Sequence, residues 1–144
     1  MAEKKLEGAG LRGQVAGQTA LSTVGKEGKG LTYRGYAIEE LSEKASFEEV
    51  AYMLLYGNLP SQAELSEYKK KLKKYRELPS ELKKVLELIP ASAHPMDVLR
   101  TGCSFLGNIE PEGDFSNQAD IADRLISIFP VSYTHLTLPT ICSV

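Results

Sequence analysis

The sequence is poor in the residues that build metal and redox sites. Its 144 residues include only two cysteines, Cys103 and Cys142, two histidines and no tryptophan. The cysteines have no companion at metal-ligand spacing, so we expect neither a metal site nor a disulfide framework. A few cysteines without a disulfide pattern are typical of a reducing compartment, which predicts a cytoplasmic protein.

A strong excess of charge and a long apolar run are also absent. The formal net charge is −2, which gives no reason to expect nucleic acid or an anionic membrane as a partner. No apolar run approaches the roughly 20 residues of a membrane-spanning helix, and residues 1–5 lack the apolar core of a signal peptide. The apolar fraction of 42% is enough for a packed domain.

The first part of the sequence predicts a small β-hairpin. Residues 1–18 begin with a polar, glycine-rich stretch, and we expect this segment to be flexible. Residues 19–24 and 31–34 have the composition of strands. The segment 25–30 between them holds three glycines, and because no helix opens behind it, it indicates a turn rather than a dinucleotide-binding loop. A lone hairpin is only marginally stable, so we expect it to pack on helices.

Helical patterns follow the hairpin. Ser46 with Glu49, and Ser61 with Glu64, have the spacing of capping boxes, in which the serine and the acidic side chain satisfy each other's free backbone N–H groups. The five amphipathic helices that we expect begin near Ser46, Ser61, Ser80, Pro95 and Asn117. The sequence therefore predicts an all-α domain over residues 19–130, with the β-hairpin at its N-terminal end.

The helix that begins near Ser61 has an apolar stripe and basic faces. The stripe consists of Leu65, Tyr68, Leu72 and Tyr75. The other faces carry five lysines and one arginine within residues 69–76. A site for phosphate or for an acidic partner is one interpretation, but we favour a solvated surface, because charge runs on amphipathic helices usually face water. Glu67 lies four residues before Lys71, a spacing that predicts a helix-supporting ion pair.

The segment around residue 94 contains the candidate site residues. His94 precedes the helix and is a candidate helix cap, interface residue or substrate contact; we favour a structural role, because no catalytic partner stands at a telling distance. Arg100 lies one turn beyond Asp97, which predicts an intrahelical ion pair or, alternatively, a contact with a substrate carboxylate. Cys103 lies among apolar residues, which predicts a buried, inert thiol. The residues alone indicate no catalytic set and no metal site.

Several stretches resemble one known family. They are residues 19–25 (TALSTVG), 31–36 (LTYRGY), 47–51 (FEEVA), 56–60 (YGNLP) and 94–101 (HPMDVLRT). In this order they resemble the N-terminal portion of the citrate synthase family. A helix that opens with His-Pro-Met marks the whole superfamily, and the longer form in residues 94–101 is most similar to the 2-methylcitrate synthase branch. The resemblance covers residues 11 to about 130.

This resemblance implies part of the citrate-synthase-type helical large domain and an acyltransferase activity. Such enzymes are homodimers that condense propionyl-CoA or acetyl-CoA with oxaloacetate; acyl-CoA is a substrate, and no cofactor or metal is implied. In the family a carboxylate removes a proton beside the thioester, and two histidines stabilise the enol and activate the oxaloacetate carbonyl. These groups belong to later parts of the family's chains, so we assign no catalytic residue here and expect the 144 residues alone to be inactive. His94 and Arg100 are the candidates for substrate contact.

A hypothesis of a different class is a stand-alone helical interaction module without catalytic activity. It follows from the absence of the family's catalytic motifs in these 144 residues. A natural stop codon behind the codons of this chain would favour the module, whereas an open frame that encodes the missing motifs would favour the enzyme.

The last residues do not continue the helical pattern. The final predicted helix ends near Phe129, and residues 131–144 form an apolar string rich in threonine and serine without a helical period. Residues 131–140 resemble the translation of a sequencing-library adapter. We therefore expect residues 131–144 to be foreign to the protein, and His135 and Cys142 to have no function.

Overall fold

The computed structural model describes residues 15, 17–25 and 30–141, with the backbone alone over residues 135–141. The chain divides into two compact units, residues 1–58 and 59–144. Most of the segment expected to be flexible, and most of the glycine-rich turn, lie outside the described residues. The predicted domain limits at residues 18 and 130 stay predictions.

The unit of residues 1–58 begins with a three-stranded antiparallel sheet in the order β1-β2-β3. Its strands are β1 (Ser22–Val24), β2 (Leu31–Tyr33) and β3 (Tyr36–Ala37). Ser22 pairs with Tyr33, and Tyr33 pairs in turn with Tyr36 across a two-residue turn. The predicted hairpin is thus confirmed as β1 and β2, and the sheet has a short third strand that the sequence pattern did not indicate.

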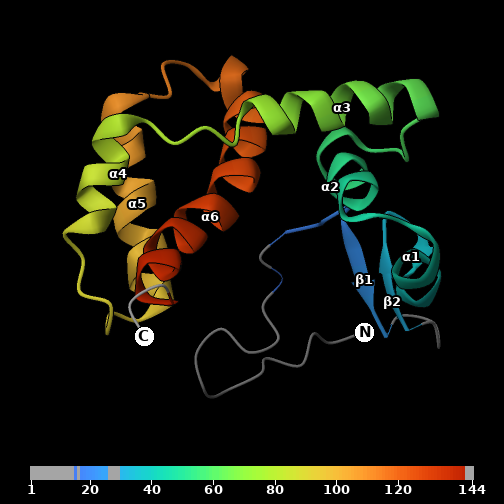
Figure 1. Cartoon of the computed structure of the whole chain (residues 1–144). Coiled ribbons are helices and arrows are strands. Elements are labelled where there is room, and N and C mark those ends of the chain that lie inside the picture. Colours follow the sequence, from blue (N-terminus) through green and yellow to red (C-terminus); the bar gives the residue numbers. More distant parts are fainter. Residues whose placement is uncertain (1–14, 16, 26–29, 142–144) are drawn as a thin grey trace, which may run out of the picture. The chain divides into compact units, whose positions relative to one another are not determined.

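Two helices complete this unit, and Figure 1 shows them beside the strands. They are α1 (Ile38–Lys44) and α2 (Phe47–Tyr56). The first predicted capping box is present, because the Ser46 hydroxyl accepts a bond from the Glu49 N–H and the Glu49 carboxylate accepts one from the Ser46 N–H at 2.7 Å. Gly57 ends α2 in the left-handed conformation with φ 104°, and its N–H donates to the Met53 carbonyl at 2.8 Å. The left-handed C-terminal residue of this helix is a glycine because glycine has no Cβ to clash there.

The unit of residues 59–144 is helical in its described residues. Its helices are α3 (Gln62–Lys74), α4 (Ser80–Glu87), α5 (Pro95–Ile109), the short 3₁₀ helix η2 (Phe115–Asn117) and α6 (Gln118–Ile141). The second predicted capping box, Ser61 with Glu64, is present at the start of α3. The fold class expected from the sequence is confirmed: a mainly helical chain with a small N-terminal antiparallel sheet.

The core of the helical unit lies where α4, α5 and α6 meet. Its buried members are Leu78, Leu82, Leu86, Val98, Leu106 and Ile128. At Gly102, where α5 faces α4, a Cβ would lie 3.6 Å from Cδ2 of Leu86, which is an ordinary contact distance. Of the stripe predicted on α3, Leu65, Tyr68 and Leu72 are buried, whereas Tyr75 at the end of the helix is half-buried.

The prediction that the last helix ends near Phe129 was wrong. α6 runs from Gln118 to Ile141, through Pro130 and Pro139. Proline removes one backbone donor from a helix and disfavours its interior, but tertiary packing favours continuation here. Val131 packs against the core cluster, and buried Ser132 donates its hydroxyl to the Ile128 carbonyl at 2.9 Å. The foreign origin of residues 131–144 stays a prediction.

The surface of the helical unit bears out the solvated interpretation of the basic residues on α3. Lys69, Lys73, Lys74 and Arg76 are exposed. The predicted Glu67–Lys71 pair does not form. Glu67 pairs with Lys70 at 2.7 Å, and Lys71 turns toward α6.

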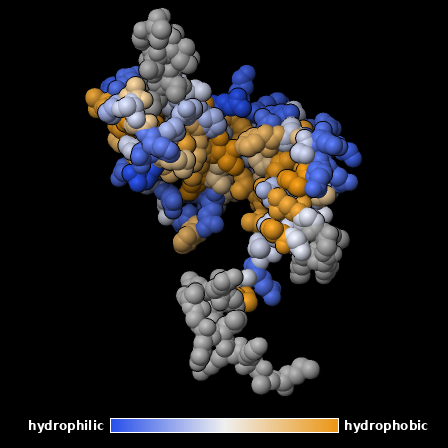
Figure 2. All heavy atoms as spheres, turned by 90° about the horizontal axis from the view of Figure 1, so that it is seen from below, coloured by the Kyte–Doolittle hydropathy of each residue, from blue (hydrophilic) through white to orange (hydrophobic). Residues whose placement is uncertain are grey.

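Figure 2 shows hydrophobic side chains reaching the surface among the charged ones. Among the residues that the structure describes, no helix has the length and apolar character needed to cross a bilayer.

Candidate functional site

His94 lies at the exposed start of α5, directly before Pro95. It is the N-cap residue, and its Nδ1 accepts a hydrogen bond from the Met96 N–H at 3.2 Å. Proline at the next position suits the first turn of a helix, where its missing N–H has no partner to lose. The structure therefore bears out the helix-cap interpretation. Because Nδ1 is an acceptor, the neutral imidazole carries its proton on Nε2, which leaves Nε2–H as a donor.

Arg100 lies on the same helix, and its guanidinium pairs with Asp97. The distance from Nη2 to Oδ1 is 3.0 Å, and the two side chains are 78% and 59% exposed. The predicted intrahelical pair is thus confirmed. An exposed pair of this kind contributes at most about 1 kcal/mol. No ion pair or hydrogen bond joins His94 to Arg100 in the described part of the chain, so the structure does not assemble them into one catalytic set.

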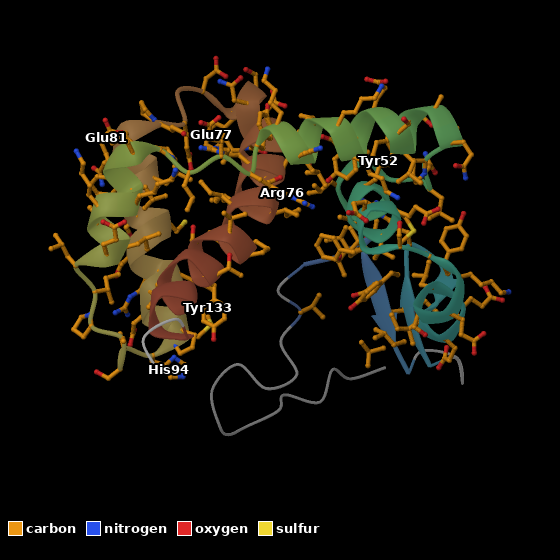
Figure 3. All side chains as sticks on the ribbon, viewed as in Figure 1. Tyr52, Arg76, Glu77, Glu81, His94 and Tyr133 are labelled. Atoms are coloured by element: carbon orange, nitrogen blue, oxygen red, sulfur yellow. The ribbon has the colours of Figure 1, made fainter. Side chains whose placement is uncertain are left out.

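A cavity of about 850 Å³ opens at the other end of α5, where α3 ends and α4 and α6 begin. Leu78, Leu106 and Leu125 form part of its apolar lining. α5 has 15 residues, which corresponds to a length of about 22 Å. The cavity and His94 are therefore separate sites on this unit. Figure 3 labels His94 at the end of α5 that lies away from Glu77 and Glu81.

Arg124 of α6 organises the wall of this cavity. Its Nε and Nη2 donate to the two carboxylate oxygens of Glu110, at 3.0 and 2.8 Å, which is the side-on fork geometry that suits a carboxylate. Its Nη1 donates to the backbone carbonyls of Tyr75 and Glu77, the latter at 2.9 Å. One side chain thereby ties the start of α6 to the end of α5 and to the segment between α3 and α4. Its donors hold helices together rather than pointing at a ligand.

A second polar network joins α3 to α6 around Asp123, which is fully buried. The Tyr68 hydroxyl donates to its Oδ1 at 2.8 Å, and Nζ of Lys71 lies 2.7 Å from its Oδ2. Lys71 also pairs with Asp120 at 2.6 Å. A buried carboxylate is costly unless it is paired and hydrogen-bonded. These contacts meet that requirement, so the network stabilises the packing of α3 against α6.

Cys103 lines the cavity and is half-buried, with a free thiol. The predicted burial is thus only partial. Among the described residues, no group of three or more histidine, cysteine, aspartate or glutamate side chains lies close enough to hold a metal ion.

Two exposed carboxylates in this unit lie at helix starts, Glu81 in the first turn of α4 and Asp114 as the N-cap of η2. The pKa of Glu81 is lowered by a bond to its own backbone N–H and by a bond from the Ser80 hydroxyl. The pKa of Asp114 is lowered by bonds that the Ser116 hydroxyl and the Ser116 N–H donate to its carboxylate. Hydrogen bonds to a carboxylate favour its charged form, which explains both directions.

The Asp123 and Arg124 networks were missed in the sequence, although one signal was present. Asp123 falls within an apolar stretch of a predicted helix, where it shares a face with Ser127 and Ile128. A charged side chain on such a face indicates a buried pair. Its partners Tyr68 and Lys71 stand more than 50 positions earlier, and nothing in a single sequence points to them.

Comparison with known proteins gives the same family as the sequence motifs. A model of the family described as "Citrate synthase, C-terminal domain" matches residues 10–138. The chain is 67% identical over 127 residues to a 2-methylcitrate synthase of Shewanella oneidensis, covering 88% of this chain and 34% of that protein. It is 46% identical over 103 residues to 2-methylcitrate synthase 2 of Corynebacterium glutamicum, covering 72% and 27%.

Solved structures agree with this. The citrate synthase of Thermotoga maritima is 34% identical, with a TM-score of 0.75, and the likeness covers 90% of this chain and 35% of that one. A citrate synthase of Thermoplasma acidophilum has a TM-score of 0.76 at 23% identity over 88% of this chain and 35% of its own, which supports the fold alone. The chain thus spans about a third or less of the length of the curated relatives named above. Since the family model matches most of its residues, the chain belongs to the citrate synthase family.

Proposed function

We propose that this chain is the N-terminal part of a 2-methylcitrate synthase or citrate synthase. The longer protein would be an acyltransferase that condenses propionyl-CoA or acetyl-CoA with oxaloacetate. The observation that carries the proposal is the 67% identity over 127 residues to a 2-methylcitrate synthase. Propionyl-CoA is the preferred acyl donor in this proposal, which places the enzyme in propionate breakdown rather than in the tricarboxylic acid cycle.

In this proposal the described residues supply a scaffold and no catalytic residue. The carboxylate and the two histidines that the family uses would come from the rest of the longer protein, which would act in the cytoplasm as a homodimer without a further cofactor. The packed α4–α5–α6 core supports the scaffold role, because catalytic groups need rigid elements to orient two substrates.

His94 and Arg100 are the candidates for contact with oxaloacetate. Both side chains are exposed, and each presents a donor: Nε2–H of His94 and the guanidinium of Arg100. A guanidinium binds a carboxylate with matching fork geometry. Because the pair with Asp97 is exposed and weak, Arg100 can exchange it for a substrate carboxylate at little cost.

The test begins with the coding sequence. Long reads across the codon for Pro130 would show which frame follows, and the longest open frame would be expressed beside the 144-residue chain. Thiol release from propionyl-CoA and acetyl-CoA in the presence of oxaloacetate is then measured. We expect release by the longer protein and none by the chain alone. Absence of release by a folded longer protein, or a natural stop codon behind residue 144, would count against the enzyme and favour a helical interaction module.

The same assay tests the finer points. One carbon group in the acyl pocket discriminates substrates by about 10- to 200-fold in kcat/KM, so we expect propionyl-CoA to be preferred within that range. Arg100→Gln in the longer protein should raise KM for oxaloacetate by about tenfold, the effect of losing one charge-assisted hydrogen bond, and leave KM for the acyl-CoA unchanged. Arg76→Gln is the matched control, because Arg76 is an exposed arginine of the same unit that lies between α3 and α4. If Arg100→Gln and the wild type have equal KM values for oxaloacetate, Arg100 does not contact the substrate and only pairs with Asp97.

A further inference from the structure

Arg34 occupies a turn position that suits few side chains. Arg34 and Gly35 connect β2 to β3 between the paired Tyr33 and Tyr36, with φ of 50° and 90°. Two-residue hairpin turns with positive φ at both positions favour asparagine, aspartate and glycine. A larger L-residue in the left-handed region costs about 1–2 kcal/mol. Backbone energetics alone would therefore not select arginine here, which indicates that the side chain has a role.

Only part of the Arg34 guanidinium has a hydrogen-bond partner. Nη2 donates to the Leu54 carbonyl at 3.2 Å, near the C-terminal end of α2, where backbone carbonyls carry partial negative charge. Nε is buried and has no hydrogen-bond partner among the described residues. A buried donor without an acceptor costs about 1–3 kcal/mol. A brace between the sheet and α2 explains Nη2, but it does not explain Nε.

Arg124 shows what the same edge of a guanidinium does when it is satisfied. There Nε and Nη2 together hold both oxygens of one carboxylate. Arg34 turns the same donor, Nε, toward no acceptor, and none of the ion pairs in the described parts of the chain includes Arg34. The neighbouring turn is open to solvent, since Gly35 is exposed and Tyr36 is 40% exposed. An acceptor can therefore reach this edge from outside with a small movement of the turn.

We propose that Arg34 is an oxyanion-binding residue whose Nε takes a carboxylate or phosphate oxygen of a small molecule. Three observations at one turn carry the proposal: the left-handed backbone of Arg34, its buried Nε without an acceptor, and the exposure of Gly35 and Tyr36 next to it. Strained backbone and unsatisfied buried donors are typical of sites held ready for a ligand. Carboxylates and phosphates are the acceptors that match a guanidinium edge, and a water-poor setting strengthens such charge-assisted bonds. This site is additional to the proposed function and does not depend on it.

The first experiment separates a binding role from a structural one. Arg34→Asn introduces a residue that the turn favours and removes the unsatisfied donor. A residue kept for binding should be replaceable without loss of stability. We expect amide hydrogen exchange in the peptide that covers residues 31–37 to stay as slow as in the wild type or to become slower, because asparagine suits the turn. The peptide that covers residues 47–57 reports the lost bond to Leu54 and does not decide the question. Faster exchange in residues 31–37 would overturn the proposal, because the turn itself would then need the arginine side chain.

The second experiment observes the donor itself. The Nε–H resonance of Arg34 is assigned by its loss in Arg34→Lys and followed by nitrogen–proton NMR of the 144-residue chain. Inorganic phosphate and oxaloacetate are titrated separately at constant ionic strength. We expect a saturable shift of the Arg34 resonance and no shift of the Arg124 resonance, whose Nε already binds Glu110.

The arms of this titration identify the ligand class. A shift with phosphate alone indicates a phosphate site, a shift with oxaloacetate alone indicates a carboxylate site, and a shift with both indicates a general oxyanion site. In Arg34→Lys, which keeps the charge but lacks Nε, anion-dependent protection of residues 31–37 should need about tenfold more anion. The proposal is wrong if neither anion shifts the Arg34 resonance, or if the Arg124 resonance shifts in parallel.

Discussion

The two units of this chain differ in how many apolar side chains they bury. In the unit of residues 59–144, six buried apolar side chains from three helices and an adjoining loop form one continuous cluster. In the described part of residues 1–58, only Thr32, Leu41, Ala51 and Met53 are buried. Hydrophobic burial is the dominant stabilising term in folding. The first unit must therefore depend more on its hydrogen-bonded helix ends and on its small sheet.

The difference extends to the polar groups of the interior. In the helical unit Asp123 and Arg124 are held by partners from other helices. In the first unit Arg34 carries both a left-handed backbone and a buried Nε without an acceptor. A scaffold whose polar groups are satisfied is rigid, whereas uncompensated cost concentrates where a ligand is to be bound. The buried polar groups at Asp123 and Arg124 thus stabilise the helical unit, whereas the buried Nε without an acceptor lies at Arg34, where we propose anion binding.

The largest expected effects come from removing one core side chain in each unit. Leu86 and Met53 are both fully buried. Leu86→Ala should lower the free energy of unfolding of the helical unit by about 2–5 kcal/mol through lost contacts and a new cavity. Met53→Ala should remove most of the exchange protection of α2, because the smaller core has little to replace it. Peptide-resolved hydrogen exchange measures both. If either variant removes the exchange protection of both units, the two units unfold together, and their difference in buried core does not give them separate stabilities.

The next effect tests the satisfied arginine. Arg124→Gln removes the fork to Glu110 and the bonds to two backbone carbonyls. The side chain of Arg124 is only 16% exposed, whereas that of Glu110 is 41% exposed. We expect a loss of about 2–3 kcal/mol, below the cost of breaking a fully buried pair because solvent reaches Glu110. A urea titration measures it.

The control for this variant is an arginine on the surface of the same unit. Arg76 is exposed, so Arg76→Gln should change the unfolding free energy by no more than about 0.5 kcal/mol. A similar loss in the two variants would mean that charge, rather than the bonds of Arg124, stabilises the unit.

The features predicted correctly from the sequence depend on residues close together in the chain. Both capping boxes and the proline that starts α5 were predicted at the right positions. Each of these signals involves backbone groups within about four positions of the side chain. At the candidate site, the cap at His94 and the pair of Asp97 with Arg100 were predictable for the same reason.

The features that were not predicted depend on distant contacts. Lys71 was expected to pair with Glu67 one turn away, but it pairs with Asp120 and Asp123 of α6. α6 continues past Pro130 because Val131 on its buried face still packs against the core. Tertiary packing here overrides local helix propensity. The sequence pattern placed Arg34 in a strand. Only the structure shows that its backbone is left-handed, which is unfavourable for arginine.

A smaller effect probes how tightly the helical core is packed. Gly102→Ala places a Cβ 3.6 Å from Leu86 Cδ2 and 3.9 Å from Leu82 Cδ1, both ordinary contact distances. Alanine is also the better helix former by about 1 kcal/mol. We expect the unfolding free energy to rise by about 0.5–1 kcal/mol. Gly107→Ala is the matched control, because it gains the same helix propensity with no atom within 4 Å. A fall in stability for Gly102→Ala alone would show that the α4–α5 approach has no room for a methyl group.

The smallest effect concerns the exposed cap before α6. Asp114 accepts bonds from the Ser116 hydroxyl and N–H, which lower its pKa below the ordinary value of 3.8. Because the folded pKa lies below the unfolded one, this cap stabilises the start of η2 fully above pH 3.8, and its contribution is lost as the pH falls through the folded pKa. The Ser116 amide resonance should therefore titrate with a midpoint below 3.8, and Asp114→Asn should abolish that titration. A midpoint at or above 3.8 would show that the bond does not favour the carboxylate. The helical unit would then owe its stability to the core and to Arg124 rather than to this cap.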